Sequence, residues 1–578
     1  MKRLSWTCVA GALWAVVGTS PAAEYYVNAG NMAENPTGTQ QNPFRTVQAG
    51  IDAAADGDEV RVAGGTYTEN LRVERKAIAL LGGYGGDWSR DIAANQTTLA
   101  GAGGNAVINI IECDATVDGF RITGGTGSTE GLPYSYLGGG IYSRDGSPTI
   151  TNNIIEDNDI RSAEPPADES RGGGVFVTNA PAATIMDNVI RGNYAGRGAG
   201  IAVFGQAALI QGNTVEDNTS VGDHGGGMYV GVVDATITQN IIRGNEVGRA
   251  LGYGWGGGLI VFNPGNSAEL SFNVVYENFA SGYGAGEFID EGATAVIHHE
   301  LIFRNISKEG CEAVSALSVD GGEGVGSRAT ISFCTIAGNV CENAIRGNGI
   351  QVEGMSEVSV TNCIFWDNGG DDFAVVPDST LAVSYTCSEE AIAGTGNIQM
   401  NPRFVDAGSD DYHLAADSPC IDAADPAAPF DQEPADNGGR ADMGRYGNAS
   451  DAPPDDNGNG NDNDNGNSNG NDNDNGNENS NGNGNGNDND NGNANDNDNE
   501  NGNANENDNG NGNLNDNDNR NDNTDNVNEN SGGDGDGDIS SGAMCPATAT
   551  MLFSITLVGA GRMRRRSGSA AADRSGRR

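Results

Sequence analysis

Between about Gly138 and Asn368, short runs of alternating apolar and polar residues recur along the chain. Each repeat opens with a glycine pair or triplet, continues with a β-branched run, and ends with two asparagines five residues apart, such as Asn188 and Asn193. The Asn188-type position recurs after 25, 27, 33 and 27 residues. Alternation in short runs is typical of strands with one buried face, and a regular period without a helical pattern indicates a solenoid.

One repeat of about 27 residues can hold three short strands and three turns, which is one coil of a parallel β-helix. Glycine at the start of each repeat permits a tight corner, and successive coils stack at roughly 4.8 Å. Inward asparagines then form ladders, because a buried amide must have its donors and acceptors satisfied. The expected ladders are Asn153, Asn188, Asn213, Asn240 and Asn273, and Asn158, Asn193, Asn218, Asn245, Asn278, Asn305, Asn339 and Asn368.

The first ladder changes residue type near its end, where Glu300, Cys334 and Cys363 replace asparagine. Cys334 and Cys363 lie one coil apart, near enough for a disulfide, but parallel in-register strands orient their Cβ atoms poorly. A disulfide and a stacked pair of thiols therefore remain equal alternatives. Cys311 and Cys341 each follow a ladder asparagine in neighbouring coils, and we expect this pair to form a disulfide first. No Cys-x-x-Cys spacing occurs, so we expect no metal site.

Several motifs carry a family resemblance: Gly-Gly-Gly-Ile141, the Ile-x-x-Asn unit ending at Asn193, Pro43-Phe44-Arg45-Thr46, and Ser418-Pro419-Cys420-Ile421-Asp422. On these motifs residues 24–447 resemble the secreted right-handed parallel β-helix superfamily, which has the pectin-lyase-like fold. The repeats also resemble those of bacterial polymorphic outer-membrane proteins. The resemblance implies an all-β, right-handed parallel β-helix solenoid with three short strands per coil.

The domain organisation follows from changes in composition. Asn42 and Pro43 suit the first positions of an amphipathic helix that would cover the open first coil. The basic and apolar start is typical of a signal peptide. The expected segments are 1–23 signal peptide, 24–136 N-terminal cap and first coils, 137–400 regular coils, 401–450 C-terminal cap, 451–543 linker rich in Asn, Asp and Gly, and 544–578 a sorting or membrane tail.

The C-terminal part of the chain shows two unusual compositions. Every odd-numbered residue from Asn457 to Asn523 is asparagine, and a segment with so little apolar surface is expected to be disordered. Asparagine holds the positions where a calcium loop needs aspartate, so only weak Ca²⁺ binding is expected there. The Met-Cys-Pro motif ending at Pro546, a short apolar run and an arginine cluster resemble bacterial C-terminal sorting signals. An ordinary membrane tail is the alternative.

A net charge of −49 disfavours binding to nucleic acid or to an anionic membrane surface. We expect an exported monomer at the cell surface or outer membrane, in contact with the membrane only through its C-terminal tail, and no cofactor.

Catalysis has only one candidate pair in the sequence. Polygalacturonase-like members of the fold need a Gly-His-Gly and an Arg-x-Lys motif, and pectate-lyase-like members need calcium-binding carboxylates beside a basic residue. Gly222-Asp223-His224-Gly225 is the nearest match, but no Arg-x-Lys partner accompanies it. Asp223 and His224 are therefore candidates for acid–base work, with a solvated loop as the alternative.

Outward positions after the glycine corners carry aromatic rings at Tyr142, Phe176, Tyr229 and Phe288, and nearby loops carry Tyr253 and Trp255. An exposed row of rings would suit sugars, which stack on aromatic faces. Loops that fold over the row and bury it are an equal alternative. The sequence thus favours non-catalytic binding of polysaccharide or another surface ligand. A polysaccharide lyase or glycoside hydrolase is one alternative, and an adhesin or spacer that binds a protein partner is another.

Overall fold

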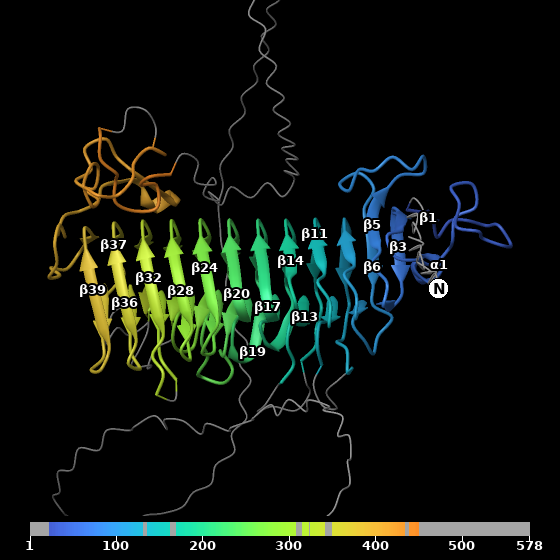
Figure 1. Ribbon diagram of the computed structural model, residues 1–578, viewed down its shortest axis with the longest axis horizontal. Helices are drawn as coiled ribbons and strands as arrows, with labels where there is room; N and C mark the ends of the chain where they lie inside the picture. Colours follow the sequence, from blue (N-terminus) through green and yellow to red (C-terminus); the bar gives the residue numbers. More distant parts are fainter. Residues whose placement is uncertain are drawn as a thin grey trace, which may run out of the picture. The chain divides into compact units, whose positions relative to one another are not determined.

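The computed structural model describes residues 22–449, apart from 131–135, 162–168, 308–314, 323, 342–348, and 434–437. The described residues all belong to the first of two compact units, Met1–Asn471. The predicted signal peptide, except Ala22 and Ala23, lies outside the described residues, as do the linker 451–543 and the tail 544–578. Within the described part, three sheets of parallel strands build the predicted β-helix (Figure 1).

The 22-stranded sheet consists of two rows of strands, which are joined because β17 (Ile201–Gln211) and β20 (Met228–Thr238) run through both rows. The other strands of row 1 follow the glycine corners in the regular coils: β4 (Leu71–Glu74), β7 (Ile108–Ile111), β10 (Ile141–Arg144), β13 (Val175–Ala180), β23 (Leu259–Phe262), β27 (Glu287–Asp290), β31 (Leu317–Val319), β35 (Ile350–Val352) and β38 (Phe373–Val375). Row 2 adds β1 (Glu24–Val27), β2 (Glu59–Ala63), β5 (Ala79–Tyr84), β8 (Thr116–Asp118), β11 (Thr149–Thr151), β14 (Ala183–Met186), β24 (Ser267–Ser271), β28 (Thr294–His298), β32 (Arg328–Ser332), β36 (Glu357–Thr361) and β39 (Thr380–Ser384).

Two smaller parallel sheets complete the coils. The 12-stranded sheet contains β3 (Gly65–Thr68), β6 (Thr97–Ala100), β9 (Phe120–Thr123), β12 (Ile154–Glu156), β15 (Val189–Arg191), β18 (Thr214–Glu216), β21 (Ile241–Arg243), β25 (Val274–Tyr276), β29 (Leu301–Phe303), β33 (Thr335–Ala337), β37 (Ile364–Trp366) and β40 (Cys387–Ser388). The 6-stranded sheet contains β16 (Tyr194–Arg197), β19 (Thr219–His224), β22 (Glu246–Val247), β26 (Phe279–Ala280), β30 (Ile306–Ser307) and β34 (Val340–Cys341). Coils that contribute to this sheet therefore have a fourth short strand beyond the three predicted.

The two asparagine ladders are confirmed. The backbone N and the side-chain Nδ2 of Asn188 both donate to Oδ1 of Asn213, at 3.0 and 2.9 Å. Asn193 binds Asn218 in the same way in the second ladder. A residue in the left-handed region precedes each ladder position, such as Asp187 with φ 53°. This corner turns the asparagine inward, where a neighbouring coil satisfies its amide.

The glycine corners also have the predicted role. Gly172 has φ 68°, and a Cβ added there would lie 2.3 Å from the carbonyl oxygen of Val175. Glycine adopts this left-handed backbone at little cost and has no Cβ to clash with the carbonyl oxygen, so other residues are disfavoured at this corner.

The N-terminal helix covers the first coil, but it begins later than predicted. Helix α1 spans Val47–Ala53, and Oγ1 of Thr46, rather than a group of Asn42, accepts a hydrogen bond from the helix N-terminus. Asn42 and Pro43 do not start the helix because Phe44 is held as extended backbone, where its N donates to Tyr26 O and its O accepts from Asn28 N.

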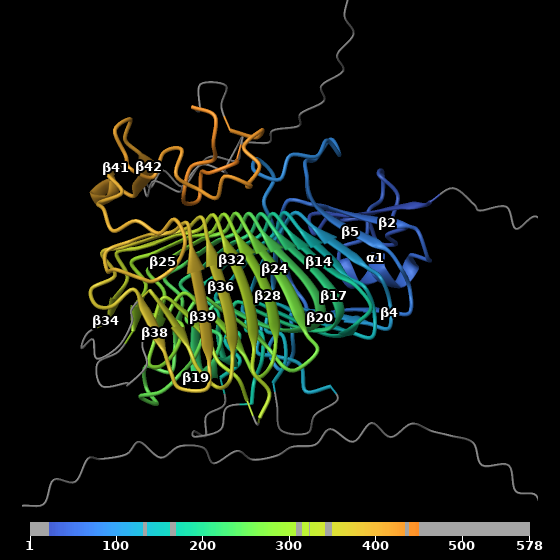
Figure 2. The same ribbon diagram turned by 60° about the vertical axis from the view of Figure 1, so that its left-hand side comes forward.

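The outer face of the 12-stranded sheet changes along the stack. In β12 to β21 the register positions alternate Glu156, Arg191, Glu216 and Arg243, and adjacent residues form ion pairs. The next strands carry apolar residues at this face, which the C-terminal segment covers. That segment contains β41 (Phe404–Asp406), the short 3₁₀ helix η1 (Ala407–Ser409) and β42 (Asp411–Leu414) (Figure 2). The predicted C-terminal cap therefore lies on the outer face of this sheet.

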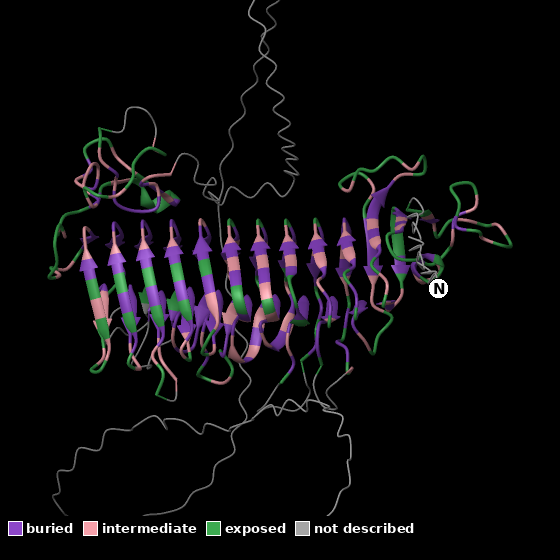
Figure 3. Cartoon of the chain, in the orientation of Figure 1, coloured by how far each residue is buried: buried purple, intermediate pink, exposed green. Residues whose placement is uncertain are grey.

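Burial follows the strand pattern. In row 2 the inward residues are buried and the outward residues are exposed or half-buried, as in Glu357–Thr361 (Figure 3). Row 1 differs, because its outward residues are also mostly buried, as in Leu259–Phe262. Segments outside the sheet must therefore cover row 1, and this covered face holds most of the residues with candidate functions.

Candidate functional site

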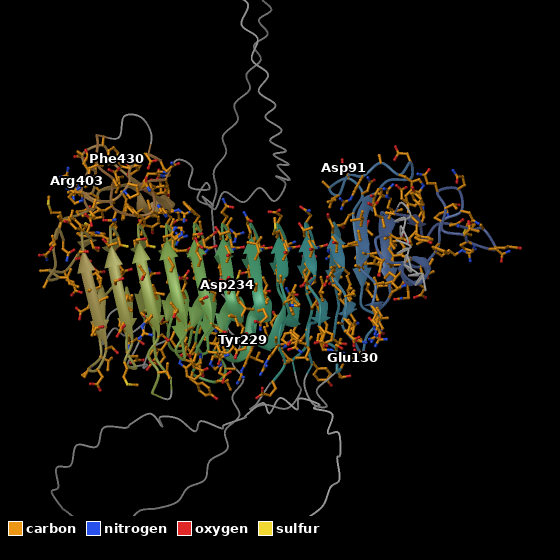
Figure 4. All side chains as sticks on the ribbon, viewed as in Figure 1. Asp91, Glu130, Tyr229, Asp234, Arg403 and Phe430 are labelled. Carbon is orange, nitrogen blue, oxygen red and sulfur yellow. The ribbon has the colours of Figure 1, made fainter. Side chains whose placement is uncertain are left out.

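The four rings predicted to form an accessible row lie at outward positions of row 1, in register from coil to coil. All four are buried: Tyr142, Phe176, Tyr229 and Phe288 are 1–5% exposed. Tyr142 stacks on Phe176 with centroids 6.0 Å apart, and Figure 4 labels Tyr229 among the side chains of this face. Of the two alternatives the sequence left open, the structure has the buried one, so these rings offer no face to a ligand.

The rings are buried because other aromatic residues pack over them. Tyr229 stacks on Phe262 at 4.3 Å, and the ring of Phe204 meets both edge-on. Trp255 and Tyr283 are partly buried against the same cluster from the loops. The outer face of row 1 thus carries a second apolar core, which contributes to stability.

An accessible aromatic side chain also lies near this core. Tyr253, in the segment between β22 and β23, is 46% exposed, and its ring lies 5.8 Å from that of the half-buried Trp255. The ring of Trp255 lies 5.0 Å from that of His224, and Trp255 N donates to Asp223 O at 2.8 Å. The structure therefore brings together four residues that the sequence proposed separately: Asp223, His224, Tyr253 and Trp255. We call Tyr253, Trp255 and His224 the ring cluster.

Asp223 is held as an ion rather than as a proton donor. Its carboxylate receives two hydrogen bonds from Arg197, Nε at 2.6 Å and a terminal nitrogen at 3.1 Å, and Nδ1 of His224 lies 2.8 Å from Oδ1. Burial alone would raise the pKa of Asp223, but contacts with His224 and Arg197 outweigh it and hold the pKa well below its usual range. Asp223 can therefore orient His224, but it is unsuited to act as a general acid.

A group of carboxyls further along row 1 was missed by the sequence reasoning. Asp290, Asp320 and Glu353 occupy equivalent outward positions on three successive coils, in register with Phe262 of the preceding coil. The buried Gln351 donates through Nε2 to Glu353 at 3.1 Å, and its Oε1 has no partner among the described residues. Within the described part of the chain, none of the three carboxyls forms an ion pair. We call Asp290, Asp320 and Glu353 the carboxyl cluster.

The pKa values of Asp290 and Asp320 are raised. Burial, reinforced by the charge of Asp320 and then that of Glu291, raises the pKa of Asp290 well above its usual range. Burial and the neighbouring Glu353 raise the pKa of Asp320 to about 7. A carboxyl with a pKa of about 7, such as that of Asp320, can donate a proton near neutral pH. In the sequence an acid follows each of Ile289, Val319 and Val352. Only the strand register shows that these three acids lie side by side on successive coils.

The predicted cysteine pairs have different outcomes. Cys334 and Cys363 are buried free thiols, stacked so that Cys334 N lies 3.4 Å from Sγ of Cys363. Of the two alternatives for this pair, the structure has the thiols. The predicted Cys311–Cys341 disulfide depends on Cys311, which lies outside the described residues. Among the residues that the structure places, no group of three or more His, Cys, Asp and Glu side chains is arranged to hold a metal ion.

In the described ranges, no helix has the length and apolarity to cross a membrane. The tail 544–578, on which the predicted anchoring depends, lies outside them.

Comparison with known proteins agrees with this architecture. Residues 94–282 match the family model described as right handed beta helix region. No curated protein matches the chain.

Three solved structures are among the matches. XylC with xylose is 11% identical, over 66% of this chain and 87% of that one, with a TM-score of 0.36. Pectate lyase Pel9A is 14% identical, over 74% and 97%, with a TM-score of 0.37. Alginate lyase from Paenibacillus sp. str. FPU-7 is 16% identical, over 58% and 94%, with a TM-score of 0.25. On its strand topology and the matched family model, this chain is a right-handed parallel β-helix protein.

Proposed function

We propose that the chain is an exported β-helix protein that binds polysaccharide through the ring cluster. The observation that supports this most directly is the exposure of Tyr253 beside Trp255 and His224. Amphipathic rings on a rigid scaffold are suited to sugars, whose C–H faces are apolar and whose edges carry hydroxyls. The binding surface is thus carried by the loops, and the buried row beneath them supports it.

The polar part of the cluster suits hydroxyl or carboxylate groups of a sugar. The imidazole of His224 is partly exposed, and its Nδ1 lies 2.8 Å from Oδ1 of Asp223, whose carboxylate also accepts two hydrogen bonds from the Arg197 side chain. Arg249, whose side chain is 56% exposed, lies over the ring of Phe279 at 3.7 Å in the next coil. An extended chain of sugars could cross several coils, because adjacent coils repeat at the sheet spacing of roughly 4.8 Å.

A glycan-binding screen tests this proposal. The full chain would be titrated with polygalacturonate, alginate, xylan and β-glucan, and compared with Tyr253→Ala and Trp255→Ala. We expect each substitution to weaken binding at least about tenfold, as loss of a stacked ring at a binding hot spot does. Phe430→Ala is the matched control, because Phe430 is 41% exposed on the C-terminal segment (Figure 4). Equal binding by all four proteins would exclude the ring cluster as the site.

A second candidate function, cleavage of a polysaccharide, is supported by the carboxyl cluster. A hydrolase needs one protonated and one ionised carboxyl at the same pH. The raised pKa values of Asp290 and Asp320 provide the first of these. The same glycans should be assayed for reducing ends and unsaturated products, with Asp320→Asn and Glu353→Gln as test variants. Products that persist in both variants would show that these carboxyls do not catalyse the cleavage.

The cellular location is also a proposal. We propose that the N-terminal signal exports the chain and that the C-terminal tail tethers it to the cell surface. Protease treatment of intact cells that produce the full chain should degrade the protein, and deletion of residues 544–578 should release it into the medium. Protection from protease would contradict export. A surface-located protein that binds no glycan would instead favour an adhesin or spacer.

A further inference from the structure

The C-terminal segment brings a cysteine against the last strand of the 12-stranded sheet. Cys387 begins β40, and its register partner Ile364 is one of the residues that face the C-terminal segment. Cys420 lies within that segment, 33 residues later in the chain. Both side chains are fully buried, and both belong to the apolar cluster between β40 and the segment.

Contacts on both sides hold the two thiols in place. Cys387 N donates to Cys363 O at 2.9 Å, and the Cys387 thiol donates to Met400 O at 3.0 Å. Cys420 is fixed because its carbonyl oxygen accepts from Met443 N at 3.0 Å. Both cysteines are free thiols in this structure and belong to one buried apolar cluster, and the neighbouring Cys387 thiol, together with burial, raises the pKa of Cys420.

The arrangement differs from that of the other thiol pair. Cys334 and Cys363 immediately precede the adjacent parallel strands β33 and β37. Their Cβ atoms therefore point the same way and cannot easily adopt disulfide geometry. Cys387 and Cys420 come from different layers that face each other, one on the sheet and one on the segment packed against it. Side chains that approach from opposite sides can place Cβ and sulfur atoms as a disulfide requires.

We propose that Cys387 and Cys420 form a disulfide that fastens the C-terminal segment to the β-helix. The electron acceptor is a disulfide oxidant such as glutathione disulfide. A thiolate of the pair attacks a sulfur of the oxidant and releases one thiol. The second thiolate then displaces the other thiol from the mixed disulfide. Two protons leave the cysteines, and the oxidant is reduced to two thiols. Since both sulfurs are buried, the reaction occurs during folding, before the segment closes over β40.

Refolding of the full chain in a glutathione redox buffer tests this. After unfolding without reductant, alkylation and trypsin digestion, we expect a peptide containing Cys420 (residues 404–440) linked to the peptide 347–403. The latter also contains Cys363, so the digest is repeated with Cys363→Ser, which should retain the link. Cys387→Ser should abolish it and leave Cys420 as an alkylated thiol. Recovery of both cysteines as alkylated thiols in the wild type would overturn the proposal, as would a link to another cysteine.

Thermal unfolding gives an independent measurement. Reductant should lower the Tm of the oxidised wild type, because the cross-link no longer restricts the unfolded chain. The Tm of Cys387→Ser and of Cys420→Ser should be insensitive to reductant. Cys334→Ser is the control, and it should respond to reductant as the wild type does. A wild-type Tm that reductant leaves unchanged would contradict a stabilising cross-link, even if one variant failed to fold.

Discussion

Along row 1 the outward side chains of β10 to β23 include the stacked rings of Tyr142, Phe176 and Tyr229. At the ends of β27, β31 and β35 the outward side chains are instead the acids of the carboxyl cluster. Both regions occupy the same face of the same sheet. In the first region burial removes apolar surface from water and stabilises the fold. In the second region burial crowds acids together and opposes their ionisation. One repeating backbone therefore supports an aromatic half and an acidic half.

The acids of the two regions should also change the stability of the fold with pH in opposite directions. Beside the aromatic region, Asp223 of β19 in the 6-stranded sheet has a pKa that is lowered in the folded protein. In the acidic region the pKa values of Asp290 and Asp320 are raised. A lowered pKa contributes stability that is lost at low pH, and a raised one makes ionisation destabilising as the pH increases.

The largest effect is expected from truncating a buried ring of the aromatic region. Tyr229→Ala should lower the free energy of unfolding by about 3–5 kcal/mol, as other large-to-small substitutions of buried aromatic residues do. Urea unfolding monitored by circular dichroism measures this. A loss below about 1 kcal/mol would show that the ring is exposed in solution and would restore the accessible row as a binding surface.

In the acidic region, Asp320→Asn should stabilise the protein at neutral pH. The pKa of Asp320 is raised to about 7, so the folded state binds more protons than the unfolded state between pH of about 4 and 7. Stability should therefore fall as the pH rises through this range, by about 2–4 kcal/mol for this group. The variant should gain this amount at pH 8 and little at pH 4. Urea titrations at both pH values check it, and an equal gain at both would contradict the assignment.

Asp223→Asn should have the opposite sign. The lowered pKa of Asp223 contributes stability above the unfolded pKa of about 4, and this contribution is lost as the pH falls further. Replacing a carboxylate that pairs with Arg197 should cost about 1.5–3 kcal/mol at pH 7. The difference from the wild type should shrink as the pH falls below about 4. A cost that stays constant down to acid pH would mean that charge is not its source.

The smallest effect on stability is expected at the ring cluster. Tyr253→Ala removes a side chain that is 46% exposed, so the free energy of unfolding should change by no more than about 0.5 kcal/mol. Tyr229→Ala and Tyr253→Ala thus compare the same chemical change at a buried and an exposed site. Thermal unfolding of both variants in one buffer makes the comparison, and equal losses would remove the distinction between core and ring cluster.

Periodic features could be predicted from the sequence, and non-periodic ones could not. The ladders were predictable because asparagine recurs at a position where its amide can bind both neighbouring coils, as Asn188 binds Ile150 O of the preceding coil and Asn213 of the following one. The burial of Phe288 was not, since it depends on loops of irregular length. Asp290 and Asp320 resemble ordinary turn residues until strand register aligns them. The start of α1 was misplaced because extended pairing of Phe44 outweighed the local preference of Asn42 and Pro43.

The asparagine ladders have a direction, and they place no limit on the number of coils. Each asparagine gives its N–H groups to the oxygen of the asparagine in the following coil, whether that coil adds 25, 27 or 33 residues. Only the ends need a different partner, as where Asn368 donates to Asp372. A whole coil could therefore be gained or lost between two asparagines, and every amide would still meet an equivalent neighbour. Duplication of coils is thus a simple route by which such a chain can change its reach.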